Sequence, residues 1–304
     1  MKTNWSLYFW PYYLVGSLNV VLIAAWLIIV ITGCAPSSDS TPDSPPPPPP
    51  RYAAYLMTDH GGVVLHNSKV HAIFWGSSWP SNPTKENGLI TFLSGLAGSH
   101  YITTGNEYYD GSGYLSGGGT YTGYHQDTTA SPSLNTSSGT YLILNEVCKE
   151  TGNNPDPTTL YLVYTDVAQN SSVSYCGWHS YGYCGGHITY FAYIPNLDMD
   201  PWTDGSSCHV NDYSTGHSQG LASEASVSAH EIMETFTDPQ LNNWYDNDPS
   251  GGQEIGDKCA WAFPPSLTTL SNGSQWKIQM EWSNRAFLNG TGLPNTHDQW
   301  GCAY

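Results

Sequence analysis

The apolar stretch from Leu14 to Ile31 constrains this chain most, because it decides in which compartment the remaining residues fold. Lys2 is the only charged residue before Asp39, and the stretch ends in Ile-Thr-Gly-Cys at Cys34. A basic start, an apolar core and small residues before a cleavage site are typical of a secretory signal. The terminal cysteine matches the bacterial lipobox, in which Cys34 carries the lipid and becomes the first mature residue. We therefore predict a lipoprotein-type signal peptide at residues 1–34.

An uncleaved membrane anchor is the alternative, because the apolar stretch is also long enough to span a bilayer. Residues 35–50 follow it, are rich in Pro and Ser, and end in six consecutive prolines. Such a run forms a stiff polyproline II spacer. This organisation predicts a linker at 35–50 and a single globular extracytoplasmic domain at 51–304, held at the membrane or at the cell surface.

Six cysteines follow Cys34 in the sequence. An even number of cysteines in an exported domain favours disulfide bonds, and their connectivity stays open at this point. A cysteine–zinc site is the other interpretation, but no Cys-x-x-Cys pair occurs. We predict a disulfide-stapled domain that uses Cys148, Cys176, Cys184, Cys208, Cys259 and Cys302.

The charge balance excludes one class of partner. The chain has 8 basic and 25 acidic residues, a formal net charge of −17, so no nucleic-acid partner is expected. Aromatic residues make up 13%, which argues against a disordered acidic segment.

Hydrophobic patterns alternate between strand-like and helix-like runs, and we predict an α/β or α+β domain with a mixed β-sheet. Strands are expected at 63–65, 70–75, 159–167, 187–194 and 276–282, with a turn at 58–62 and short strands and loops in 105–125. Helices are expected at 84–98, 139–150 and 222–237.

The helix predicted at 222–237 carries the residues that point to chemistry. His230 and Glu234 are four residues apart and share one helix face, and Glu231 is the next residue round. This is the logic of the H-E-x-x-H zinc motif with its second histidine replaced by a carboxylate. His230 and Glu234 are therefore candidate metal ligands, and Glu231 is the candidate general base for a metal-bound water.

A third ligand is needed beyond the helix. Glu254 is our first choice, because it lies twenty residues beyond Glu234, about as far as the downstream glutamate of thermolysin-type zinc peptidases. Pro239 must end the helix, so the chain can turn and bring Glu254 back. The competing candidates are two carboxylates and two imidazoles: Asp246, Asp257, His179 and His187.

Acidic residues gather in this part of a chain that is otherwise poor in charge, and few basic residues accompany them. Carboxylates without basic partners repel one another, so a bound cation would hold them together. Zinc is the predicted cofactor, and calcium is the alternative because oxygen-rich clusters suit it.

Three blocks of the sequence resemble the EXORDIUM / phosphate-induced protein 1 family of secreted plant proteins and their microbial relatives. They are GGVVLHNSKVHAIFWG at 61–76, LYLVYTDVAQNSSVSYCGWHSY at 160–181 and FTDPQLNNWYDNDPSGGQEIGDKC at 236–259. The resemblance implies an extracellular or cell-wall location, disulfide positions at Cys176 and Cys259, and a site role for His179. The pair His230–Glu231 departs from typical plant members and is similar to microbial relatives, so the plant growth role is not carried over.

Two functional hypotheses arise from these features. The first is a secreted, membrane-tethered, metal-dependent hydrolase of zinc-metallopeptidase type, with a zincin-like metal-site helix and a peptide or protein substrate. The second is a non-enzymatic, EXORDIUM-like surface module that binds a cell-wall glycan or a protein and holds a structural metal or none.

Overall fold

The structure, a computed structural model, describes residues 55–134, 139–168, 175–199, 208–248 and 253–304. Pro50–Tyr304 forms one compact unit, which contains all of these residues. The remaining unit, Met1–Pro49, lies outside the described residues, and with it the predicted signal peptide, Cys34 and most of the predicted linker. Among the residues that are described, no helix has the length and apolar character needed to cross a membrane.

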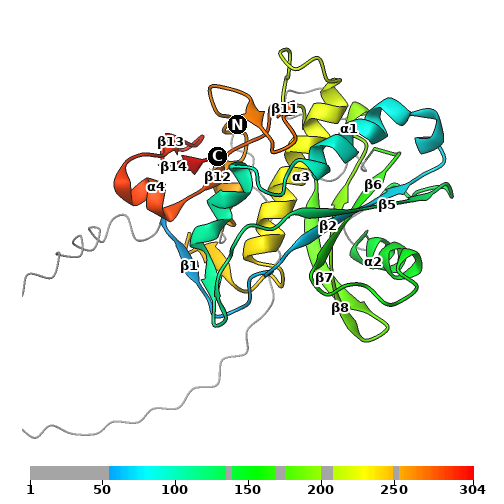
Figure 1. The fold of residues 1–304 in the computed structure, drawn as a ribbon, viewed down its shortest axis with the longest axis horizontal. Coiled ribbons are helices and arrows are strands. Elements are labelled where there is room, and N and C mark those ends of the chain that lie inside the picture. Colours follow the sequence, from blue (N-terminus) through cyan, green and yellow to red (C-terminus); the bar gives the residue numbers. More distant parts are fainter. Residues whose placement is uncertain (1–54, 135–138, 169–174, 200–207, 249–252) are drawn as a thin grey trace, which may run out of the picture. The chain divides into compact units, whose positions relative to one another are not determined.

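A five-stranded mixed sheet forms the centre of this unit, in the order β5-β2-β6-β8-β7 (Figure 1). Four strands run parallel, and β7 pairs antiparallel with β8 at one edge. The middle strand β6 is buried at every residue, as a parallel strand covered on both faces should be. The strands are β2 (Lys69–Trp75), β5 (Thr120–Asp127), β6 (Thr159–Thr165), β7 (Trp178–Cys184) and β8 (His187–Ile194).

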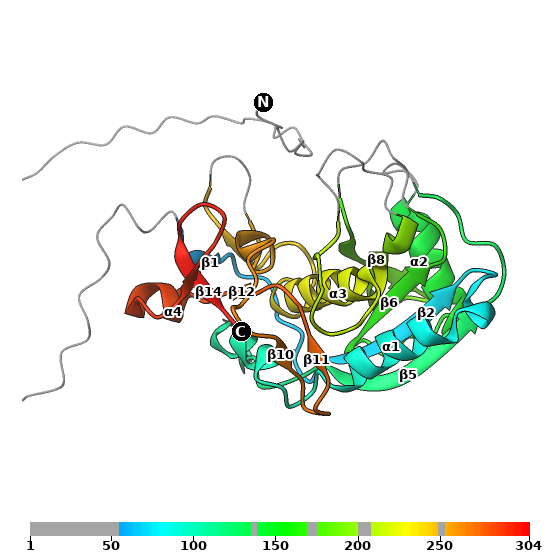
Figure 2. The same cartoon turned by 90° about the horizontal axis from the view of Figure 1, so that it is seen from above.

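Helices cover both faces of the sheet (Figures 1 and 2). Side chains alternate along each strand, so Phe74 and Leu162 join the core with α1 (Pro83–Ser94) and α3 (Gln219–Thr237). Their neighbours Ile73 and Val163 face the other way and pack with α2 (Gly139–Glu150). The molecule is thus an α+β domain in which α3 lies between the sheet and the C-terminal region.

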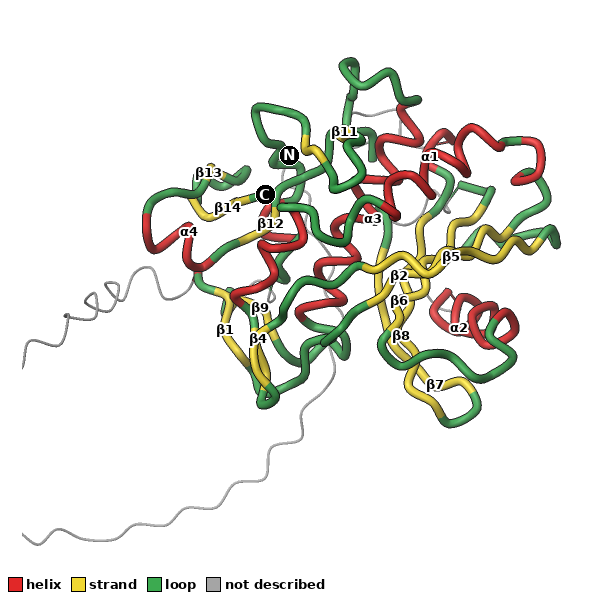
Figure 3. Tube along the Cα trace, in the orientation of Figure 1, coloured by secondary structure: helices red, strands yellow, loops and turns green. Residues whose placement is uncertain are grey.

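Short elements surround the other side of α3 (Figure 3). The three-stranded sheet β12-β14-β13, the hairpin β10–β11 and the antiparallel pair of β1 with the distant β9 are formed largely by residues that follow α3. The remaining strands are β1 (Met57–Asp59), β3 (Tyr109–Asp110), β4 (Gly113–Tyr114), β9 (Trp244–Asp246), β10 (Thr268–Thr269), β11 (Gln275–Trp276), β12 (Glu281–Trp282), β13 (Leu293–Pro294) and β14 (Trp300–Ala303). The remaining helices are α4 (Asn284–Asn289) and the 3-10 helices η2 (Trp79–Ser81), η3 (Tyr101–Glu107), η4 (Leu197–Met199) and η5 (Asp257–Cys259).

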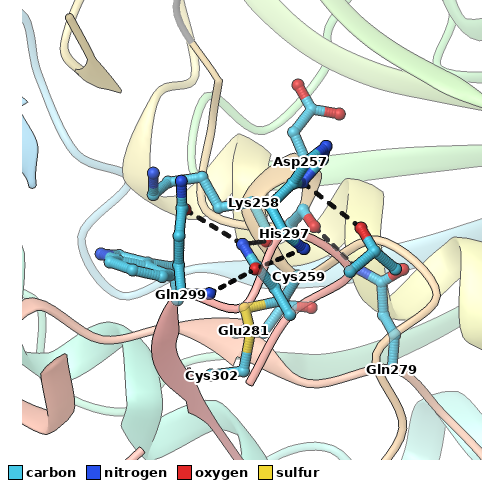
Figure 4. The surroundings of a disulfide bond; sticks show 12 residues. Asp257, Lys258, Cys259, Gln279, Glu281, His297, Gln299 and Cys302 are labelled. Atoms are coloured by element: carbon cyan, nitrogen blue, oxygen red, sulfur yellow. Dashed lines mark hydrogen bonds between the residues drawn. A yellow bond between two sulfur atoms is a disulfide. The ribbon is translucent and has the colours of Figure 1, made fainter. Parts of the chain in front are cut away.

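All six predicted cysteines form disulfides, which confirms a disulfide-stapled domain of the kind found outside the cytoplasm. Cys148–Cys184 joins α2 to the end of β7. Cys176–Cys208 joins the segment before β7 to the segment before α3. Cys259–Cys302 joins η5 to β14, and Figure 4 shows this bond beside the turn that carries Asp257 and Lys258.

The long periodic segments were predicted closely, and the short ones were not. Helix α2 and strand β8 have the predicted bounds, and α3 begins three residues early because the Ser218 hydroxyl accepts a hydrogen bond from the Leu221 N–H. The strand predicted at 63–65 is wrong, since the Leu65 N–H donates to the Phe236 carbonyl at the end of α3. The strand predicted at 276–282 is two separate strands, β11 and β12, and β7 was not predicted.

Candidate metal centre

Helix α3 carries three of the candidate site residues in its second half. Every residue from Gly220 to Thr237 is buried except His230, which is partly exposed. The helix is thus enclosed by the rest of the domain, and its polar side chains are held in set positions inside the protein. One helical turn brings His230 Nε2 to 2.9 Å from Glu234 Oε1. Glu231 lies beside this pair, so the structure brings the three residues of the motif together as predicted.

Strand β7 brings a second imidazole to the same place. Trp178 packs on the α2 side of the sheet, and His179, the next residue, points the opposite way toward α3. The His179 Nδ1 atom lies 3.4 Å from Glu231 Oε2 and 3.4 Å from Glu234 Oε2. The Cys176–Cys208 disulfide fixes the chain just before this strand. His179, ranked from sequence only as a competitor, is therefore part of the centre.

The loop after α3 returns two carboxylates to the helix. Glu254 Oε1 lies 3.6 Å from His179 Nε2, and Asp257 Oδ1 lies 3.7 Å from His230 Nε2. The Asp257 N–H also donates to Glu234 Oε1 at 3.1 Å. A Cβ atom at Gly256 would lie 2.8 Å from His230 Nδ1, so only glycine allows the loop to approach the ring this closely.

The candidate ligand atoms form two groups that share Glu234. His179, Glu234 and Glu254 have ligand atoms within 4.8 Å of one another, and so do His230, Glu231 and Glu234. The trio expected from sequence, His230, Glu234 and Glu254, thus spans both groups instead of forming one of them. We use the name metal centre for six residues: His179, His230, Glu231, Glu234, Glu254 and Asp257.

Within the part of the chain that the structure describes, the carboxylates of the metal centre form ion pairs with histidines. Among the described residues, the ion pairs of its four carboxylates are all to His179 or His230. Burial lowers the pKa of the His179 ring, but the charge of Glu254 and hydrogen bonds to Glu231 and Glu234 outweigh it and raise the pKa well above its usual value. The pKa of His230 is raised in the same way by Glu234. The carboxylates of the centre therefore favour a positive charge beside them.

Burial acts on the carboxylates in the other direction. It raises the pKa of Glu231, and the partial burial of Asp257 together with the charge of Glu234 raises the pKa of Asp257 to about 7. Burial would also raise the pKa of Glu234, but the charges and hydrogen bonds of His230 and His179 outweigh it and lower that pKa. Glu234, which faces both histidines, is thus the acid most strongly held as a carboxylate.

A second layer of polar groups supports the centre, and sequence reasoning missed it. Gln279 Nε2 lies 2.9 Å from His230 Nδ1 and donates to the Gly256 carbonyl at 3.1 Å. Glu281, whose pKa burial raises well above its usual value, accepts a hydrogen bond from the buried Tyr101 hydroxyl. Figure 4 shows Gln279 and Glu281 close to the Asp257 turn. The sequence gives one indication of Gln279 and Glu281: polar residues occupy alternate positions in the run 276–282, which is otherwise apolar.

Two competing candidates lie elsewhere. Asp246 Oδ2 is 2.7 Å from the Nζ atom of Lys258, and both side chains are buried. Asp246 therefore already has a cation and does not join the metal centre. His187 pairs with Cys184 at the turn of the β7–β8 hairpin, whereas His179 pairs with Ala192 near its other end.

No family model, curated protein or solved structure matched the chain. The functional argument therefore rests on the chemistry of its own residues, and the resemblance to the EXORDIUM family stays a prediction.

Proposed function

We propose that this chain is an exported, membrane-tethered, zinc-dependent hydrolase of metallopeptidase type. The observation that carries the proposal is a group of two histidines and four acids, of which His179, Glu231 and Glu234 are buried, without Lys or Arg partners among the described residues and with Glu231 beside the His230–Glu234 pair. An exported protein with three disulfides suits this role, because disulfides persist outside the cytoplasm. The membrane tether rests on the sequence of residues 1–34.

The donor atoms favour zinc over calcium. Zinc accepts imidazole nitrogen together with carboxylate oxygen, whereas calcium takes oxygen ligands almost exclusively. The His179 Nε2 and Glu254 Oε1 atoms are buried and have no hydrogen-bond partner, as expected of groups prepared for a ligand. His230 and Glu234, with His179 or Glu254, would hold the metal, which supplies a polarised carbonyl and an acidified water when bound.

Glu231 is the proposed general base. Its pKa is raised by burial, and a carboxylate with a raised pKa is a stronger base near neutral pH. His179 Nδ1, 3.4 Å from Glu231 Oε2, orients the carboxylate. Glu231 would take a proton from the attacking water at an Oε atom and return it to the leaving nitrogen of a peptide bond.

The path of the substrate to Glu231 is indicated by exposure. The Asp257 side chain is about half exposed (48%), and the Glu254 and His230 side chains are partly exposed, so the centre faces solvent on the side of the 253–257 loop. A helix with metal ligands behind a mixed sheet is similar to the zincin arrangement, which supports the proposal by analogy alone.

The test compares wild type with Glu231→Gln in the full chain, purified with its disulfides formed. A mixture of unstructured peptides serves as substrate, and bound metal is measured by elemental analysis. We expect the variant to keep its zinc and to lose activity by about 10²- to 10⁴-fold, the usual contribution of a general base. Glu150→Gln, a change of the same kind on α2, serves as the control and should cleave as wild type does.

Cleavage that persists in Glu231→Gln would contradict the proposed mechanism. If wild type shows no peptide cleavage, either with bound metal or after metal removal, the alternative function is favoured. That alternative is a surface module that binds a glycan or a protein.

A further inference from the structure

We infer that the metal centre holds two divalent ions, with the Glu234 carboxylate as the bridge between them. The inference rests on the proposed function, since it concerns the same site, and it specifies what that site binds. It starts from the two ligand groups, which share Glu234 and otherwise consist of different residues.

The two oxygens of Glu234 face different histidines. Oε1 lies 2.9 Å from His230 Nε2, and Oε2 lies 3.4 Å from His179 Nδ1. The Glu234 carboxylate therefore lies between the two imidazoles and belongs to both ligand groups, which places it to bind one ion on each side. The His179 nitrogen left for the second ion is the unpartnered Nε2, because Nδ1 faces Glu231 and Glu234. A single ion on the helix pair His230–Glu234 would use only one of these oxygens, or both on the same side.

Each half of the centre contains one imidazole and a further carboxylate besides Glu234, and the His230 half also contains Glu231, the proposed general base. On one side His230 is accompanied by Asp257, whose Oδ1 lies 3.7 Å from His230 Nε2. On the other side His179 is accompanied by Glu254, whose Oε1 lies 3.6 Å from His179 Nε2. One nitrogen and two oxygens per ion suit zinc, which leaves a coordination position for water on each ion.

Charge supports two ions over one. Histidines that bind a metal are neutral, so Glu231, Glu234, Glu254 and Asp257 together would carry four negative charges. One divalent ion neutralises half of this charge, and two neutralise all of it. No Lys or Arg of the described residues pairs with these carboxylates, and uncompensated charge is costly in a buried site.

The buried atoms without partners lie in the half that the helix motif does not explain. His179 has a side chain only 3% exposed, and its Nε2 atom has no hydrogen-bond partner. The Glu254 Oε1 atom is also buried and unpartnered. An ion held by His230 and Glu234 alone would leave both atoms unsatisfied, whereas a second ion between His179 and Glu254 satisfies them.

The test is the metal content of the full chain, purified with its disulfides formed, stripped with a chelator and reloaded with Zn²⁺. Elemental analysis should find two zinc ions per chain in wild type, and one each in His179→Ala and His230→Ala. His187→Ala, a histidine on β8 outside the centre, is the matched control and should keep two. Zinc X-ray absorption of wild type should show a zinc–zinc distance of about 3.5–4 Å.

The wild-type measurements need no variant and so do not depend on how well the variants fold. One zinc per chain with no zinc–zinc scattering would overturn the two-ion inference and leave the proposed hydrolase intact. No bound zinc would overturn both. Two zinc ions per chain without a zinc–zinc distance in the absorption spectrum would place the second ion outside the metal centre. That result would also overturn the bridging role of Glu234.

Discussion

On the face of the sheet covered by α2, the residues Asp127, Glu146 and Glu150 bring carboxylate oxygens within 4.8 Å of one another, as the metal centre does. There, however, a lysine completes the group. Lys149 Nζ lies 3.1 Å from Glu146 Oε1 and 3.2 Å from Glu150 Oε1, and it pairs with Asp127. We call these four residues the lysine cluster. The metal centre has no such residue among the described part of the chain and relies on two histidines.

The comparison shows that close carboxylates alone do not define a metal site. The chain has only 8 basic residues, and several of them neutralise buried acids. Lys258 pairs with Asp246, and Lys85 pairs with Glu224 and Asp198. The proposal therefore places the outside cation at the acidic cluster that pairs with no lysine among the described residues. Four predictions test this difference, from the largest expected effect to the smallest.

Replacing Lys258 with Met should cause the largest loss of stability. Both Lys258 and Asp246 are buried, so the change leaves an uncompensated buried carboxylate and should lower the free energy of unfolding by about 3–5 kcal/mol. Lys69→Met removes the half-exposed ion pair with Asp156 and should cost less than about 1 kcal/mol. Urea unfolding with intact disulfides measures both losses. Equal losses would show that burial does not determine how much each lysine contributes to the free energy of unfolding.

Zinc should stabilise the protein through the metal centre and not through the lysine cluster. A ligand at 100 times its dissociation constant raises the free energy of unfolding by about 2.7 kcal/mol for each site. We expect at least this gain in wild type, and no gain in Glu234→Gln, where the shared ligand is lost. Asp127→Asn should leave the gain unchanged. Thermal unfolding with and without zinc provides the measurement, and the reverse pattern would place the ion in the lysine cluster.

The lysine cluster should depend on pH, because one lysine does not neutralise three acids. Burial, with a hydrogen bond that protonated Glu146 donates to the Asp127 carboxylate, raises the pKa of Glu146 from 4.5 to about 7 against the opposing effect of Lys149. The folded state thus favours the protonated acid, a contribution that is complete below pH 4.5 and lost as the pH rises through 7. Between pH 4.5 and 8, wild type should lose about 1–3 kcal/mol relative to Glu146→Gln. Parallel unfolding curves at both pH values would refute the raised pKa.

Lys149→Met should have the smallest effect on stability and should convert the lysine cluster into a cation site. Lys149 is 52% exposed, so its ion pairs are screened and their loss should cost about 1 kcal/mol or less. The three remaining carboxylates offer only oxygen, which suits calcium. Calorimetry in a Glu234→Gln background, which disables the metal centre, should detect calcium binding only when Lys149 is replaced. Binding with Lys149 present would show that the lysine does not fill the site.

Local patterns predicted the parts of the molecule that depend on neighbouring residues. The i, i+4 spacing placed His230 and Glu234 on one face of α3, and the apolar run 187–194 matched β8. Strand β7 escaped prediction because it lacks an apolar run: Ser180 and Gly182 interrupt it, and its burial ranges from buried to exposed. Since β7 carries His179, half of the metal centre depended on a strand pairing that no local pattern reveals.

The fates of Asp246 and Asp257 show a second limit. From sequence both were equal candidates downstream of the helix, and Lys258 directly follows Asp257. In the fold, the Lys258 side chain turns away from its neighbour and pairs with Asp246, which leaves Asp257 to His230. Which acid receives the lysine is decided by how β9 and η5 pack, and sequence adjacency carries no information on that choice.

The Cys259–Cys302 disulfide has a consequence for the order in which the protein matures. During synthesis Cys259 emerges two residues after Asp257, and its partner follows 43 residues later. In that interval the nascent loop carries a free thiol next to the acids of the centre, and a thiolate is a softer and stronger zinc ligand than a carboxylate. Oxidation removes this competitor and, through β14, fixes the loop in place. Formation of this disulfide before metal loading would thus keep the Cys259 thiol from competing for the proposed zinc ions.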